Sequence, residues 1–128
     1  MNRRHLAGFL ILHVIAATAL YGAWRAGLLV EFFAADEMGL TALIAAVAVI
    51  GVFGVAMQRW GLVEFVKIQC PTLGLLGTAV GFSLAVAGLG ADDGGFELKL
   101  LGLNTALNTT IAGLIGHLWL ALSERLLK

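Results

Sequence analysis

The chain has 128 residues, of which 60% are apolar and only 12% are charged, and its mean hydropathy is +0.97. A soluble domain usually carries about 25% charged residues, so this composition excludes an ordinary soluble protein and indicates a membrane protein. Eight basic and eight acidic residues give no net charge and no indication of nucleic-acid binding, and the single cysteine, Cys70, excludes an intramolecular disulfide.

Four stretches without Asp, Glu, Lys or Arg are long enough to cross a bilayer as helices. A helical span needs about 20 mostly apolar residues, because only helices or closed barrels satisfy every backbone group in hydrocarbon. The four stretches are approximately 6–24, 40–57, 72–90 and 100–122. We therefore expect an all-α membrane protein with four transmembrane helices and one domain, residues 1–128.

The charged residues between these stretches predict the orientation. With the N-terminus inside, six cations lie on the inner side and only Arg25 and Lys99 lie outside, which is a strong positive-inside bias. The inner cations are Arg3, Arg4, Arg59, Lys67, Arg125 and Lys128. Both chain ends are thus predicted to be cytoplasmic.

The predicted loops are short. Residues 58–71 mix apolar and charged side chains, which is typical of a helix lying at the membrane interface, and a helical extension of the second span is an equally good interpretation. The segment Ala91-Asp92-Asp93-Gly94-Gly95 predicts a turn, since Asp and Gly accommodate the required backbone angles.

The third span is rich in glycine. Pro71 is expected at its first position, where the missing N–H costs nothing. Gly77 and Gly81 form a G-x-x-x-G motif and Gly74 falls near the same stripe, so a neighbouring helix can approach to backbone contact. Such faces occur in most multispan proteins, and this motif alone predicts packing rather than a function.

The fourth span carries five amide or hydroxyl side chains within seven residues, which are Asn104, Thr105, Asn108, Thr109 and Thr110. Polar groups inside a membrane are costly unless they are paired or face water. Two interpretations are open: hydrogen bonds that hold helices together, or the wall of a water-lined path.

Two segments together resemble the MotA/TolQ/ExbB proton-channel family, which includes the flagellar stators. The segment from Pro71 to Gly81 is similar to the Pro-x-(Leu/Ile)-Gly-Leu-x-Gly-Thr-Val-x-Gly pattern of an outgoing span, and the segment from Ala106 to Leu114 to the Ala-Leu-x-Thr-Thr-x-x-Gly-Leu pattern of the returning span. The resemblance covers roughly residues 70–120. It implies that Thr78 and Thr110 face a central pore.

The resemblance also implies partners and a location. The chain would form a homo-oligomeric ring, with five copies as the family arrangement, in a bacterial inner membrane. No predicted span contains a carboxylate, so the proton carrier would be a single-span partner of the MotB/TolR/ExbD kind with a membrane Asp. The ring would pass protons or sodium ions and convert the flow into mechanical work.

Two departures from the family pattern matter. The inner loop of about 14 residues replaces a large cytoplasmic insertion, so the cytoplasmic machinery that meets a rotor is expected to be missing. Thr105 stands where some branches carry a Glu, which weakens the case for coupling. A stand-alone four-span transporter or channel, or a non-conducting assembly protein, is the alternative function.

The candidate residues fall into three groups. The pore-lining candidates are Thr78, Thr110, Thr105, Asn108 and Thr109, and the helix-packing candidates are Pro71, Gly74, Gly77, Gly81 and Gly113. His117 lies seven residues after Thr110 and is either a packed histidine or a proton relay, whereas for His13 we favour packing. We expect no enzymatic activity, no cofactor and no metal site.

Overall fold

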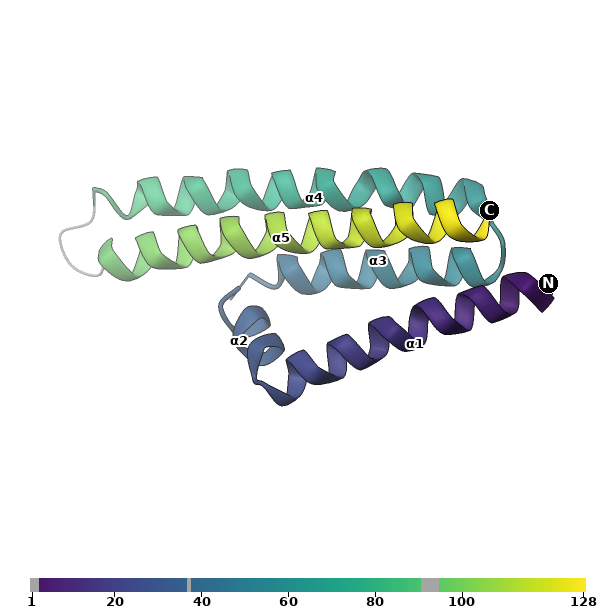
Figure 1. Ribbon diagram of the computed structural model, residues 1–128. Helices are drawn as coiled ribbons and strands as arrows, with labels where there is room; N and C mark the ends of the chain where they lie inside the picture. Colours follow the sequence, from purple (N-terminus) through teal and green to yellow (C-terminus); the bar gives the residue numbers. More distant parts are fainter. Residues whose placement is uncertain (1–2, 37, 91–94) are drawn as a thin grey trace.

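The computed structural model describes residues 3–36, 38–90 and 95–128. These residues form five helices and no strand, which confirms the all-helical class. The helices are α1 (Arg3–Arg25), α2 (Leu28–Ala34), α3 (Leu40–Ala56), α4 (Trp60–Ala87) and α5 (Gly95–Leu127). Figure 1 shows α3, α4 and α5 packed side by side, with α1 diverging from them toward α2.

Three of the described helices, α1, α4 and α5, are long and apolar enough to cross a membrane. The fourth apolar helix, α3, has 17 residues, and at 1.5 Å per residue it is about 26 Å long, close to the lower limit for a span. These helices overlap the four predicted stretches. Both termini lie at one end of the bundle (Figure 1).

The short helix α2 lies between the first two predicted spans. Glycines at both ends allow the chain to turn, since Gly27 precedes α2 with φ 78° and Gly39 precedes α3 with φ 70°. The buried Asp36 carboxylate then accepts a hydrogen bond from the Thr41 backbone N–H at 2.5 Å. This bond satisfies one of the free N–H groups in the first turn of α3.

Residues 58–71 were expected to form either a helix lying at the interface or an extension of the second span. Trp60–Cys70 is helical, but it belongs to α4 and continues directly into the third span, whereas α3 ends at Ala56. The apolar positions of Trp60–Cys70 recur every three or four residues and pack against the other helices, with Val63, Val66 and Cys70 buried in one core with Val55 and Leu120. Burial of this stripe favours one continuous helix over a surface loop.

Pro71 accordingly lies inside α4 rather than at its first position. The predicted turn at residues 91–95 falls largely outside the described residues, and Gly95 begins α5. The helical hairpin of α4 and α5 is therefore much longer than expected. With 28 and 33 residues, the two helices are about 42 and 50 Å long, against a hydrocarbon core of about 30 Å.

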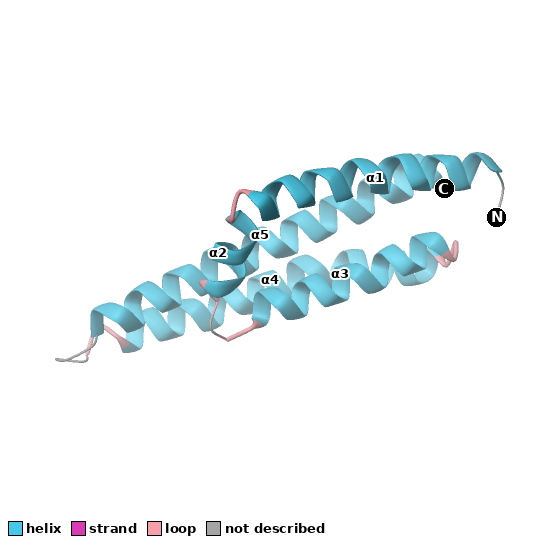
Figure 2. Cartoon of the chain, turned by 90° about the horizontal axis from the view of Figure 1, so that it is seen from below, coloured by secondary structure: helices cyan, strands magenta, loops and turns pink. Residues whose placement is uncertain are grey.

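The Leu40 end of α3 lies partway along this hairpin. A Cβ on Gly116 would lie 3.1 Å from the Cys70 Sγ and 3.3 Å from the Ala48 Cβ, so these three positions share one level. Farther out, the Asn108 amide donates to the Phe32 carbonyl at 3.0 Å and ties α2 to α5. The view from below shows the hairpin continuing past α2 and the start of α3 (Figure 2).

Candidate functional site: a threonine pair in the groove between α4 and α5

The two long helices touch through their glycines. A Cβ on Gly81 would lie 2.6 Å from the Ala106 backbone nitrogen, and one on Gly113 would lie 2.6 Å from the Cys70 carbonyl oxygen. Gly74 lies against the Thr109 carbonyl, while Gly77 leaves the space that the Thr109 side chain fills. The four packing glycines predicted from the sequence therefore all lie at the contact between α4 and α5.

Thr78 and Thr110 meet across this contact. Their hydroxyl oxygens are 2.5 Å apart, and each hydroxyl also lies within hydrogen-bond distance of a main-chain carbonyl of its own helix. Thr78 reaches the Gly74 carbonyl at 2.9 Å and Thr110 reaches the Ala106 carbonyl at 2.7 Å. Both residues are partly exposed, while their hydroxyls are bonded to each other and to the main chain.

The pair lies on the wall of a groove of about 210 Å³. The other lining residues are Pro71, Gly74, Leu75 and Leu114. These four side chains are apolar or absent and the two hydroxyls are engaged with each other and with carbonyls, so the surface of the groove is almost entirely apolar. The segments that carry the family resemblance thus contribute both walls.

The other three pore-lining candidates lie elsewhere. Thr105 and Thr109 are fully buried inside the chain, so they are removed from any surface that could line a path. Thr109 donates to the Thr105 carbonyl at 2.7 Å and packs under Gly77. Asn108 is partly buried, and its amide donates a hydrogen bond to the Phe32 carbonyl of α2. Asn108 and Thr109 thus contact other helices, whereas the Thr105 hydroxyl has no hydrogen-bond partner among the described residues. Of the five candidates, only Thr78 and Thr110 line the groove.

The position of His117 explains how a proline fits inside α4. Proline has no N–H, so the carbonyl four residues earlier loses its helical hydrogen-bond partner. That carbonyl belongs to Lys67, and the Nδ1 of His117 lies 2.8 Å from its oxygen. A carbonyl only accepts, so Nδ1 carries the proton and donates it across from α5.

This pairing makes a prediction about stability. We expect His117→Ala to lower the free energy of unfolding by about 1–2 kcal/mol, because it leaves the Lys67 carbonyl without a partner. In a Pro71→Ala background the restored backbone N–H takes that carbonyl, so the same histidine change costs little. Unfolding of the four proteins in mixed detergent measures the coupling, and equal losses in both backgrounds would contradict the assignment.

His13 is packed, as expected. Its Nδ1 lies 2.9 Å from the Phe9 carbonyl oxygen, its ring stacks on Phe9 at 4.0 Å, and its edge meets Trp119 at 5.6 Å. Together with His5, which reaches the Leu127 carbonyl at 3.0 Å, it attaches the first half of α1 to α5. The second half of α1 leaves the bundle (Figure 1).

Sequence reasoning missed several contact residues. Gly102 and Gly116 are buried at helix contacts, and a Cβ on Gly102 would lie 2.5 Å from the Ala85 nitrogen. Nine positions of α5 are buried, and apart from Gly95 and Thr105 they form one stripe: Gly102, Ala106, Thr109, Gly113, Gly116, Leu120 and Ser123. Their alternating spacing of four and three residues is the pattern that could have identified them.

No family model, curated protein or solved structure matches this chain. The class that the fold defines is a helical membrane protein with a long glycine-packed hairpin.

Proposed function

We propose that this chain is the pore-wall subunit of an ion-channel complex in a bacterial inner membrane, in which proton or sodium flow drives mechanical work. The observation that carries the proposal is the hydrogen-bonded pair of Thr78 and Thr110, two residues that line an apolar groove between the two helices that resemble the MotA/TolQ/ExbB core. Ion passage past a carboxylate needs walls that solvate it without a competing fixed charge.

The hydrogen-bond inventory of the pair suits that task. Two hydroxyl protons serve three acceptors: the Gly74 carbonyl, the Ala106 carbonyl and the neighbouring hydroxyl. Two protons can occupy only two of these three acceptors at a time. Rotation of a hydroxyl about its C–O bond can therefore move its proton from one acceptor to another. In one arrangement a hydroxyl donates to an incoming carboxylate, and in another it accepts from the protonated acid.

We assign the groove to the Asp side chain of a single-span partner. The groove's volume of about 210 Å³ admits a side chain rather than a whole helix, so the Asp would enter between Pro71 and Leu114 while its helix lies outside. The apolar walls would exclude bulk water and strengthen the hydrogen bonds to the two threonines.

A ring of copies, five by the family resemblance, would surround the partner. The outer part of the hairpin, beyond the start of α3, exposes large apolar side chains that include Phe82, Val86, Leu103 and Leu107. Neighbouring copies and lipid are the surfaces that can cover them. His117 has a structural role in this proposal, since a relay needs both ring nitrogens and Nδ1 is bound to a carbonyl that cannot take a proton.

The test is ion flux in the membranes of the native host. We expect Thr78→Ala with Thr110→Ala to reduce proton or sodium flux at least tenfold, because the carboxylate loses its donors. Flux is followed with a pH- or sodium-sensitive dye in everted vesicles, and the mass of the detergent-extracted complex reports whether a single-span partner remains bound. Serine at both positions keeps the hydroxyls and is expected to retain most of the flux.

Thr72→Ala is the matched control. Thr72 lies on the same helix and its hydroxyl also donates to its own backbone, at 2.8 Å from the Ile68 carbonyl oxygen, but it does not line the groove. Unchanged flux in the double alanine variant with the complex intact would overturn the proposal. Flux from the purified chain without any partner would favour a stand-alone channel instead.

A further inference from the structure

The groove between α4 and α5 is poor in oxygen ligands for a metal cation. A sodium ion that leaves water needs protein oxygens in place of its hydration shell. Two side-chain oxygens line the groove, those of Thr78 and Thr110, and they are hydrogen-bonded to each other at 2.5 Å. Each hydroxyl also lies within hydrogen-bond distance of a carbonyl of its own helix. Two oxygens that are already engaged are too few to replace a hydration shell.

The main-chain oxygen that could add to these two is occupied. Pro71 lines the groove and has no N–H, so the Lys67 carbonyl lacks its helical hydrogen-bond partner. Carbonyls freed in this way are the usual sodium ligands of interrupted membrane helices. Here the His117 Nδ1 lies 2.8 Å from the Lys67 oxygen and donates to it from α5. The proline therefore adds no free ligand to the groove.

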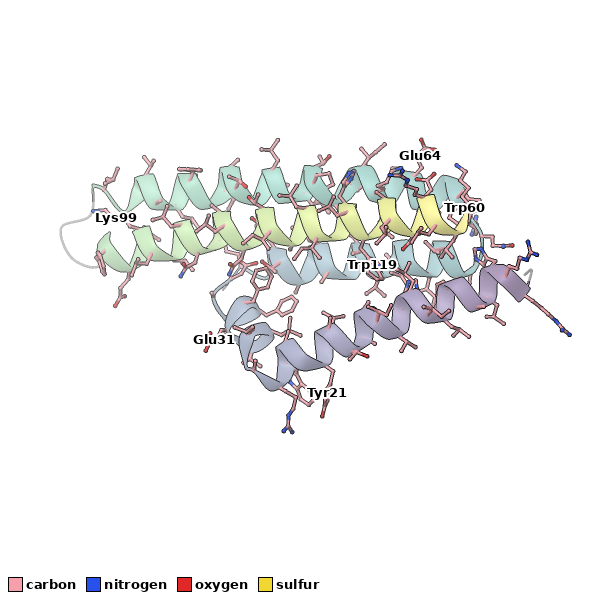
Figure 3. All side chains as sticks on the ribbon, viewed as in Figure 1. Tyr21, Glu31, Trp60, Glu64, Lys99 and Trp119 are labelled. Carbon is pink, nitrogen blue, oxygen red and sulfur yellow. The ribbon has the colours of Figure 1, made fainter. Side chains whose placement is uncertain are left out.

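The carboxylates of α4 and α5 lie far from the threonine pair. One is 14 residues before Thr78, and the other two are 13 residues before and 14 residues after Thr110, which is about 20 Å along the helix axes. They are Glu64, Glu97 and Glu124. Figure 3 shows Glu64 toward one end of the hairpin and Lys99 at the other. Asp36 caps α3 and does not line the groove. The described part of the chain thus places no negative charge in the groove to balance a metal cation.

A proton makes smaller demands on the same surroundings. When it binds the Asp carboxylate of the partner, it forms an O–H bond and leaves a neutral acid, which needs only hydrogen-bond partners when it is buried. A sodium ion beside that carboxylate leaves two charges, and both must be taken out of water. Leu75 and Leu114 line the groove and offer neither charge any solvation. An apolar groove with two hydroxyls therefore suits the neutral acid.

From the few oxygens and the absence of charge in the groove we infer that the transported ion is a proton and not sodium. The inference rests on the proposed function, since it takes the partner Asp as the carrier. The carboxylate accepts one proton from water on the outer side and becomes a neutral acid, which donates a hydrogen bond to Thr78 or Thr110. It then releases the same proton to water on the inner side and regains its charge.

The experiment uses the complete complex in everted vesicles of the native host. Flux is driven once by a pH gradient in sodium-free potassium buffer and once by a sodium gradient at equal pH, and vesicles from a host without this chain give the background. We expect proton flux without sodium, no sodium flux above background, and at least a tenfold loss of proton flux when Thr78 and Thr110 are both alanine.

A polar substitution in the groove tests the physical reason. Leu114→Asn adds an amide oxygen to the groove wall, so we expect added sodium to compete and to lower proton flux about threefold. Leu118→Asn is the matched control, because Leu118 is an exposed residue of the same helix that does not line the groove. In that variant sodium is expected to change proton flux less than 1.5-fold.

The outcomes separate this inference from the proposed function. Sodium flux that exceeds background and requires both threonines would overturn the choice of ion and leave the proposed function in place. Flux of neither ion above background would overturn the proposed function and the inference with it. Equal responses of Leu114→Asn and Leu118→Asn to sodium would contradict the argument from oxygen ligands.

Discussion

Gly81→Ala is expected to lower the free energy of unfolding by about 3 kcal/mol, the upper part of the range for overpacked interiors. The added Cβ would lie 2.6 Å from the Ala106 nitrogen and against the Gly102 carbonyl, and both are backbone atoms of α5. Backbone cannot move aside as a side-chain end can, so the helices must separate along the contact. Unfolding in mixed detergent, followed by circular dichroism, measures the loss.

Gly61→Ala is the control, because Gly61 lies on the same helix with nothing within 4 Å of the added Cβ. There alanine is the better helix former by about 1 kcal/mol, so stability is expected to stay level or rise. If Gly81→Ala were as harmless as Gly61→Ala, the close contact of α4 and α5 would be contradicted.

Glu124→Ala is expected to cost about 2 kcal/mol, between the ranges for surface and buried ion pairs. The Lys67 ammonium and the Glu124 carboxylate are 2.5 Å apart and only 21% and 16% exposed, so either charge left alone would be poorly solvated. Lys67 also gives its carbonyl to His117. The fifth helix therefore holds this one residue of α4 by both its main chain and its side chain.

The exchange of charges tests whether the pair itself matters. Lys67→Glu combined with Glu124→Lys is expected to recover at least half of the loss, measured by the same unfolding assay. Glu64→Ala serves as the comparison, since Glu64 is an exposed carboxylate on α4, and it is expected to change stability by less than about 0.5 kcal/mol. A double variant no more stable than Glu124→Ala would contradict a specific pair.

The sequence predicted where the apolar helices lie but not how far α4 and α5 extend. Charge-free runs identify the hydrocarbon segments, and they cannot reveal that Trp60–Cys70 continues as helix beyond the charged Lys67. Local sequence also predicts Pro71 at a helix start, because the group that binds the Lys67 carbonyl in place of the missing N–H is remote: His117 lies 50 positions from that carbonyl. A contact of that kind is invisible to local pattern.

The candidate site shows a similar division. The glycine spacing predicted the packing face of α4, because small residues at three and four positions apart share one side of a helix. Spacing alone could not show which polar residues of α5 are buried and which line the groove. Thr109 and Thr110 are neighbours, yet the first is fully buried under Gly77 and the second reaches the groove. Only the position of α4 distinguishes them.

The contact between His5 and Leu127 has a consequence for biosynthesis. It joins residues 122 positions apart, the His5 ring being 3.0 Å from a carbonyl in the last turn of α5. During translation, α1 leaves the ribosome first, yet its docking site does not exist until residue 127 has been made. The first helix therefore cannot complete this contact until the last turn of α5 has been synthesised.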